Sequence, residues 1–210
     1  MLFRSYRIPE NAPIEPASDA HVLVLNTGQC VLYELFKSDH EGTGRWRASS
    51  AAMFDLRSNQ LRPDGWTSAD AAGLPMLPGL VRYDEVASGR ITHAIRFTVQ
   101  RTRRAYVWPA RHYASYSTDP NLPPMGQRFR LRATFDISKF GPQERVILTA
   151  LKEYGMMLAD NGGNWYISGA PDVRWDRTMT EQFHGVLGSD FEAVDSAPLM
   201  VGTNSGEARQ

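Results

Sequence analysis

Cysteine is almost absent from this chain of 210 residues, and its charges cancel. The single cysteine, Cys30, excludes an internal disulfide and a thiolate metal cluster. Its place in a strand-like run predicts a small buried hydrophobe. Acidic and basic residues balance at 23 each, so the molecule has no overall field that would attract nucleic acid. We therefore expect no nucleic-acid partner.

Long apolar runs are also missing, because no stretch approaches the ~20 residues of a bilayer span. We therefore expect no membrane partner. No secretory signal precedes Tyr6. Residues 2–5 are what an adapter-like DNA string encodes in one reading frame. We interpret these first residues as an artefact and expect the reading frame to be truncated at its start. In that case the missing leader says nothing about where the protein is located.

Several short catalytic motifs do not occur. The chain has no Gly-x-Ser-x-Gly, no phosphate-binding loop, no Gly-x-Gly-x-x-Gly and no His-Glu-x-x-His. Their absence argues against α/β-hydrolases, nucleotide enzymes and zinc proteases of the His-Glu type. Carboxylate chemistry has no short motif, so it stays open.

The residues that are present describe a globular, β-rich chain. Hydrophobic residues make up 42% and charged residues 22%, as in an ordinary folded domain. Residues 21–36 predict a buried hairpin, and the alternation over 91–99 and 128–135 predicts two strands, with His93 on the apolar side of the first. We expect an extended segment over 1–20, one β-rich domain over 21–197 and a frayed tail over 198–210.

Helical patterns are few. Residues 142–154 predict the main helix, which begins at Pro142 and ends before Gly155. Shorter helices are predicted over 67–73 and 78–87, with a weaker one over 178–187 and a second hairpin over 156–168. The predicted fold is therefore mainly β, or β-dominated α+β. It would be a sandwich or partly closed barrel with one main helix and short helices in loops.

An unusual stretch, residues 106–125, contains four prolines, four aromatic residues and the pair Arg111-His112. No regular helix or strand accommodates this mixture, so we expect a long, stiffened surface loop. Long ordered loops in compact domains are usually functional. We therefore expect this loop to face a binding or active site built with residues 66–85.

Carboxylates offer the chemistry that fits such a site. Hydrolysis of a glycosidic bond uses two carboxyl groups roughly 5 to 10 Å apart. Asp70 and Asp84 are the predicted acid/base pair, because both lie in short elements near Trp66, and His112 is a candidate proton donor. The structural alternative is a helix-start role for Asp70 and an arginine partner for Asp84.

Flat rings and hydrogen-bonding groups near these carboxylates suggest how a sugar would be held. Aromatic rings in loops suit stacking on sugar faces, although large aromatics are also ordinary core residues. The predicted substrate-binding residues are Trp66, Glu85, Trp108, Arg111, Tyr113, Asp160 and Trp165. No metal or other cofactor is expected, and a site formed by His21, His93 and His112 is a weaker alternative.

Three segments carry a resemblance: residues 65–85, 106–113 and 154–162. They resemble a largely uncharacterised family of secreted, β-rich proteins from soil bacteria, over residues 6 to about 200. The resemblance implies an extracellular location but no catalytic residues. We predict a secreted polysaccharide-active enzyme that cleaves glycosidic bonds. The alternatives are a non-catalytic carbohydrate-binding or surface-interaction module, and a histidine-based metal-dependent enzyme.

Overall fold

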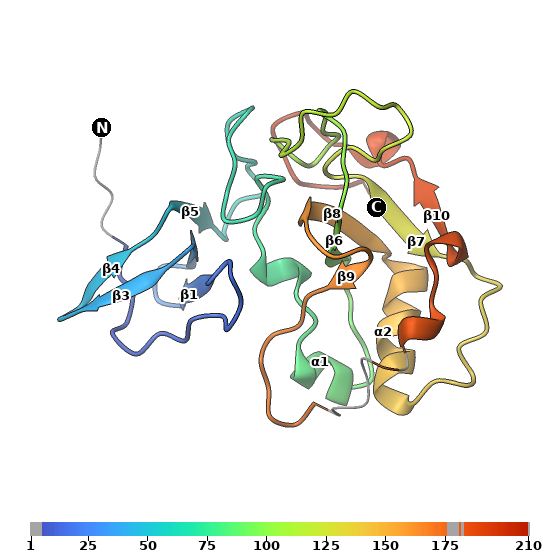
Figure 1. The fold of residues 1–210 in the computed structure, drawn as a ribbon, viewed down its shortest axis with the longest axis horizontal. Helices are drawn as coiled ribbons and strands as arrows, with labels where there is room; N and C mark the ends of the chain where they lie inside the picture. The colour runs from blue at the N-terminus through green and yellow to red at the C-terminus, as the bar shows by residue number, and fades with distance from the viewer. Residues whose placement is uncertain (1–5, 176–180, 182, 210) are drawn as a thin grey trace.

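The computed structural model describes residues 6–175, 181 and 183–209. Its N-terminal part is a three-stranded antiparallel sheet in the order β1-β2-β5, to the left in Figure 1. These strands are β1 (Val22–Asn26), β2 (Val31–Phe36) and β5 (Ser50–Asp55). A small hairpin of β3 (Asp39–Gly42) and β4 (Arg45–Arg47) extends from this sheet. We call the three-stranded sheet the small sheet.

The first hairpin forms as predicted, but Cys30 does not lie in its second strand. β1 ends at Asn26 and β2 begins at Val31, so Cys30 is the last residue of the connecting turn. It is exposed and has a φ of 51°, in the left-handed region that turn residues adopt. The prediction of a buried cysteine was therefore wrong.

The second sheet has five strands in the order β10-β7-β8-β6-β9 and is strongly curled (Figure 1). Its strands are β6 (Ile95–Val99), β7 (Arg128–Leu131), β8 (Met156–Asn161), β9 (Tyr166–Ile167) and β10 (Phe191–Val194). β6 and β8 are parallel, and the other neighbours are antiparallel. We call it the large sheet. The predicted β-dominated fold is confirmed.

The predicted hairpin over residues 156–168 is wrong. β8 and β9 do not pair with each other, because both pair with β6 from opposite sides. The connection between them crosses the end of β6, where Gly162 N–H donates to Val99 O at 2.9 Å. A Cβ at Gly162 would lie 2.8 Å from Thr98 Oγ1, so the crossing needs glycine here.

The main helix is confirmed as α2 (Pro142–Glu153), with Pro142 in its first turn. Its buried side chains, among them Ile147, Leu148 and Leu151, join Phe97 and Leu158 in the core beneath the large sheet. No described helix is long and apolar enough to cross a membrane. α2 thus completes the main hydrophobic core of the molecule.

The other helical elements are short. They are η1 (Leu77–Gly79), α1 (Tyr83–Ala87), η2 (Phe183–Gly185), η3 (Gly188–Asp190) and η4 (Ala197–Leu199). η1 and α1 lie within the predicted helix over 78–87. Residues 67–73 form turns rather than the predicted helix, because their polar backbone groups bind distant parts of the chain. Part of the predicted helix over 178–187 lies outside the described residues.

The end of the chain is held rather than frayed. Leu61 N–H donates to Asn204 O, and Gly206 N–H donates to Asn59 O, so the last residues lie beside residues 59–61. Residues 6–20 have no helix or strand, as expected of an extended segment, and Tyr6 packs edge-on against Tyr33. The described part of the predicted tail, residues 198–209, therefore makes backbone hydrogen bonds with residues 59–61.

Candidate functional site

Residues 68–77 run between the small sheet and the large sheet, and we call them the bridging segment. Such a buried irregular stretch needs a partner for every polar backbone group. The Glu34 carboxylate, on β2, accepts from Met76 N at 2.8 Å and from Leu77 N at 3.0 Å. From the other side, Asp160 Oδ2 on β8 accepts from Ala71 N at 3.0 Å. One carboxylate from each sheet therefore fixes the bridging segment.

Asp70, the first predicted catalytic residue, lies inside the bridging segment and is only 1% exposed. Its two oxygens accept from Arg96 Nη2 at 2.6 Å and from Arg96 Nε at 2.9 Å. Arg96 lies on β6, is itself buried, and also contacts the Ser168 hydroxyl. This bidentate pair neutralises a guanidinium that would otherwise be buried without a counter-ion. Both oxygens of Asp70 are therefore used in binding Arg96.

The two carboxyl groups that hold the bridging segment have raised pKa values. Burial raises the pKa of Glu34 to about 7, against the lowering effect of its bonds from Leu77 and Met76. Burial, followed by the nearby Asp70 charge, raises the pKa of Asp160 to about 6. Perturbed carboxyl groups often mark functional sites. Here both accept backbone hydrogen bonds, as structural groups do.

Asp84, the second predicted catalytic residue, lies on α1 with its side chain 83% exposed. It accepts from Arg174 Nη2 at 2.8 Å, so an arginine partner is present, as the structural alternative expected. Its neighbour Glu85 pairs with Arg82 at 2.6 Å and contacts His93 at 3.3 Å. Asp70 and Asp84 thus bind different arginines in different environments, and the structure does not bring them together as a pair.

The three histidines considered as metal ligands make separate contacts. His21 Nδ1 lies 2.6 Å from Glu15 Oε2, His93 contacts Glu85, and His112 Nδ1 lies 3.0 Å from Ala71 O. Among the described residues, no group of three or more His, Cys, Asp or Glu side chains is placed to hold a metal ion. His112, also a candidate proton donor, instead supports the bridging segment.

Two predicted contact residues, Trp108 and Arg111, hold loops together. The buried Arg111 side chain donates to Arg62 O at 2.8 Å and to Thr203 O at 2.9 Å, while Trp108 Nε1 donates to Ser205 O at 2.7 Å. Main-chain bonds join Arg111 to residues 65 and 72. The two segments expected to face each other, 66–85 and 106–125, are therefore in direct contact.

Aromatic side chains meet the solvent in these loops. The loop over residues 106–125 runs along the top of Figure 1. Trp66 is 57% exposed and Tyr116 is 87% exposed, while Tyr106 and Tyr113 are half-buried. The rings of Tyr106 and Tyr113 are nearly parallel with centroids 6.4 Å apart, and His112 stacks on Tyr113 at 5.5 Å. We call Trp66, Tyr106, Tyr113 and Tyr116 the aromatic ridge.

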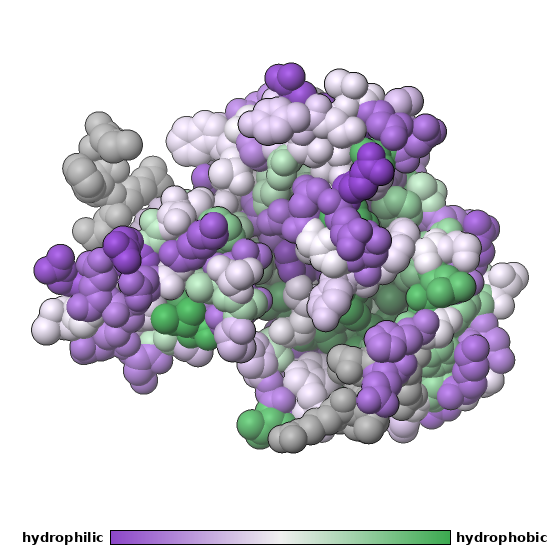
Figure 2. All heavy atoms as spheres, viewed as in Figure 1, coloured by the Kyte–Doolittle hydropathy of each residue, from purple (hydrophilic) through white to green (hydrophobic). Residues whose placement is uncertain are grey.

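Charged groups lie at the edges of these rings. Tyr106 Oη donates to Asp64 Oδ1 at 2.8 Å, and Arg104 Nε donates to Tyr113 Oη at 3.2 Å. The Arg62 guanidinium lies 5.5 Å from the centre of the Trp66 ring. Figure 2 shows the same end of the molecule as pale and purple, with little green. The ridge therefore combines flat rings with donors and acceptors, a mixture that suits polyhydroxylated ligands.

Trp165, also predicted to bind substrate, belongs to the core. Its ring is nearly parallel to Phe97 at 5.5 Å and to Phe191 at 5.2 Å, and Phe129 meets it edge-on. Trp165 has a φ of 56°, which turns the chain from β8 toward β9. Its ring therefore packs against the core, and part of its surface lines a cavity beside the large sheet.

Several important residues were missed as site residues. Glu34 is a carboxylate within an apolar strand, which is a signal in the sequence, but its partners, Met76 and Leu77, are more than forty residues away. Arg96 lies on the face of β6 opposite Phe97, and nothing in the sequence signals that the bridging segment covers this face. Asp64 has no sequence signal beyond its place in a loop. Comparisons with protein-family models, curated proteins and solved structures found no match.

Proposed function

We propose that this chain is an extracellular carbohydrate-binding module that holds polysaccharide on the aromatic ridge. The exposed Trp66 carries the proposal, because a large aromatic ring that faces solvent on a well-held loop is a natural stacking surface. Main-chain bonds from Gly65 to Arg111 and from Trp66 to Pro63 hold its backbone at 2.8 and 3.1 Å. Preorganisation of this kind lowers the entropy lost on binding.

Charged neighbours support a sugar as the ligand. Asp64 and Arg104 already bond to tyrosine hydroxyls in the ridge, so each lies where a sugar hydroxyl could exchange hydrogen bonds with it. The extracellular location is supported by the resemblance to secreted proteins. Binding is favoured over cleavage because Asp70 and Asp84 each pair with an arginine. Glycosidic cleavage is the competing function, and the same experiment tests it.

A polysaccharide panel tests the proposal, with binding measured by affinity electrophoresis and titration calorimetry. Trp66→Ala and Tyr116→Ala should each weaken binding about tenfold, which corresponds to ~1.4 kcal/mol. Tyr166→Ala is the matched control, because Tyr166 is 69% exposed but lies on β9. This control should bind like the wild type.

Two results would overturn the proposal. One is wild-type affinity in both ridge variants. The other is release of reducing sugar by the wild type that Asp84→Asn abolishes, which would establish cleavage with that carboxylate.

A further inference from the structure

A cavity of about 560 Å³ lies between the large sheet and the loop over residues 120–124. This volume is within the usual range for small-molecule sites. Phe129 on β7 and Ala193 on β10 are paired across the sheet and line one wall. Val99, the last residue of β6, lines another part together with Gln100, Arg101 and Arg103. We call this cavity the arginine pocket, after Arg101 and Arg103.

The charged side chains that line the arginine pocket are all positive. Arg101 and Arg103 contribute two guanidinium groups, and no Asp or Glu among the described residues lines the cavity. Within the described part of the chain, neither side chain forms an ion pair or a hydrogen bond, and Arg103 Nε is buried without a partner. A buried donor left unpaired is uncommon and calls for an explanation. The two guanidinium groups have no counter-ion among the described residues, and an anionic ligand in the cavity would supply one.

A nearby carboxylate does not fill this role. Asp119 lies two residues before the lining residue Asn121, and its Oδ1 accepts from Asn121 N at 2.9 Å and from Asn121 Nδ2 at 3.1 Å. Asp119 does not itself line the cavity. The positive charge of the arginine pocket is therefore open to a ligand.

The rest of the lining is apolar or amide in character. Phe129, Trp165, Leu122 and three prolines give an apolar surface, and four amide side chains also line the cavity: Gln100, Asn121, Gln127 and Asn164. Gln127 uses its amide nitrogen on Arg128 O and Val194 O. Its amide oxygen accepts no hydrogen bond from the described residues. The pocket therefore suits a compact ring with hydroxyl groups and one negative charge.

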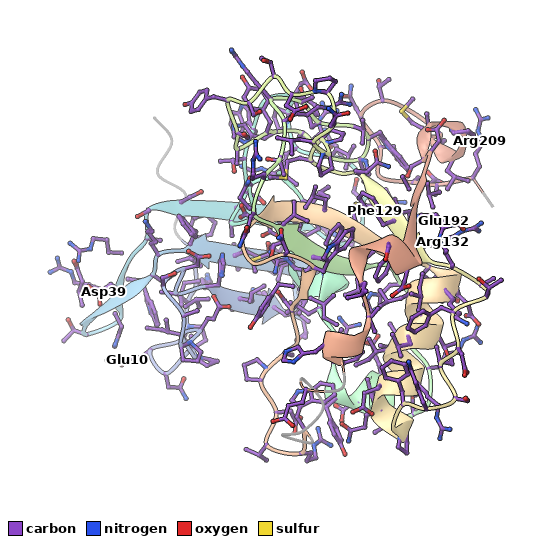
Figure 3. All side chains as sticks on the ribbon, turned by 45° about the vertical axis from the view of Figure 1, so that its right-hand side comes forward. Glu10, Asp39, Phe129, Arg132, Glu192 and Arg209 are labelled. Atoms are coloured by element: carbon purple, nitrogen blue, oxygen red, sulfur yellow. The ribbon has the colours of Figure 1, made fainter. Side chains whose placement is uncertain are left out.

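The opposite face of the same strands has a different charge pattern. Next to Phe129 and Ala193, the side chains of Arg130 and Glu192 form an ion pair, and Arg132 lies 3.7 Å from Glu192. Phe129, Arg132 and Glu192 lie close together at this edge of the sheet in Figure 3. Arg130 and Arg132 on that face have a carboxylate partner, whereas Arg101 and Arg103 have none among the described residues.

The geometry points to a second binding site, and we propose that the arginine pocket binds a carboxylate-bearing sugar ring of the uronic acid class. Arg103 pairs with the carboxylate, because an arginine fork matches its two oxygens. Phe129 and Leu122 cover the apolar side of the ring, while the amides bind its hydroxyls. This site is distinct from the aromatic ridge, because none of the four ridge residues lines the arginine pocket.

Titration calorimetry with glucuronate, its neutral methyl ester and inorganic sulfate tests this site. Glucuronate should bind at least tenfold more tightly than the ester, because the ester lacks the charge that Arg103 recognises. Sulfate should bind more weakly than glucuronate, because it cannot use the apolar wall. Equal affinity for acid and ester would overturn the proposal, and so would tighter binding of sulfate or no binding of glucuronate.

Variants locate the binding. Arg103→Gln should weaken glucuronate binding at least tenfold, and Arg132→Gln, on the opposite face of the sheet, should leave it unchanged. Asn164→Asp keeps the acceptor for Gln100 N, which Asn164 Oδ1 now binds at 3.0 Å, and adds a repelling charge. It too should weaken binding, with a melting temperature like that of the wild type. Full affinity in both pocket variants would overturn the proposal.

The ridge variant Trp66→Ala separates the two proposals. It should retain wild-type glucuronate affinity even if it loses polysaccharide. Loss of glucuronate binding in this variant would place the acid on the ridge and overturn the arginine pocket. Failure of the panel experiment on polysaccharides leaves the glucuronate result unaffected, so the two proposals fail separately.

Discussion

Single residues in this chain show how a carboxylate in a loop can be structural. Asp70 has the position and type expected of a catalytic acid, yet both of its oxygens bind the buried Arg96. Burying two opposite charges as a pair costs little free energy, whereas burying one of them alone is strongly destabilising. The function of Asp70 is therefore to neutralise Arg96 and hold the bridging segment against β6.

We expect Asp70→Asn to lower the free energy of unfolding by about 3 to 5 kcal/mol, because it leaves Arg96 buried without a counter-ion. Asp84→Asn should stay close to the wild type, since the Asp84–Arg174 pair lies in water. Urea denaturation of both variants measures the difference. Similar stabilities for the two would contradict the structural role of Asp70.

The sequence predicts only in part which side chains are buried by other segments of the chain. The alternation over 91–99 correctly separated the two faces of β6, including Arg96 on the face opposite Phe97. It could not show that the bridging segment covers this second face, because the contact joins residues 26 positions apart. Alternation tells which side chains share a face, and tertiary packing decides which faces meet water.

Elements formed by local interactions were the most predictable. α2 has a proline at its start, a glycine after its end and an apolar face, so it was predicted to within one residue. The pairing of β9 with β6 was not predictable in this way, because the nearest strand in sequence is β8. The candidate site follows the same rule: the contact between segments 66–85 and 106–125 was expected, but not the side chains that make it.

Gly73 is the residue on which the course of the bridging segment depends. It has a φ of 74°, and a Cβ there would lie 2.4 Å from Trp66 O and 3.2 Å from Arg111 Cβ. We expect Gly73→Ala to destabilise the protein by at least 2 kcal/mol, from backbone strain and the clash together. Thermal or urea denaturation measures the change.

Gly89→Ala is the control for this change. Gly89 has a φ of 85°, but nothing lies within 4 Å of the position of its Cβ. It should therefore cost only the backbone term, about 1 kcal/mol. Equal destabilisation in the two variants would show that the close approach to Trp66 and Arg111 contributes nothing to the loss of stability in Gly73→Ala. Polysaccharide binding should fall in Gly73→Ala alone, because Trp66 is the residue displaced.

The molecule as a whole joins two sheets through buried acids, and this makes its stability depend on pH. Glu34 has a folded pKa of about 7 against an ordinary value of 4.5, and Asp160 one of about 6 against 3.8. At a pH between the ordinary and the folded pKa of either group, the folded state binds more protons than the unfolded state. Stability is therefore greatest at the low end of this range and declines as pH rises.

We expect the free energy of unfolding to fall as pH rises from about 4.5 to 7, with a contribution from Glu34 of the order of 3 kcal/mol. Glu34→Gln removes this group, so its stability should fall less across the same range. Arg57 and Arg174 lower the pKa values of Asp55 and Asp172 to about 2. These two groups therefore change the pH dependence of stability only below about pH 4. Parallel pH profiles for wild type and variant, measured by denaturation, would exclude the Glu34 contribution.

The parallel pairing of β6 with β8 has a consequence for how the chain folds. Ile95 pairs with Met156, about sixty residues later, and the chain between them includes β7 and α2. Joining strands so distant in sequence closes a long loop before the contacts form, which slows folding. Refolding should therefore be slow for a domain of this size, and α2 should form earlier than the centre of the large sheet.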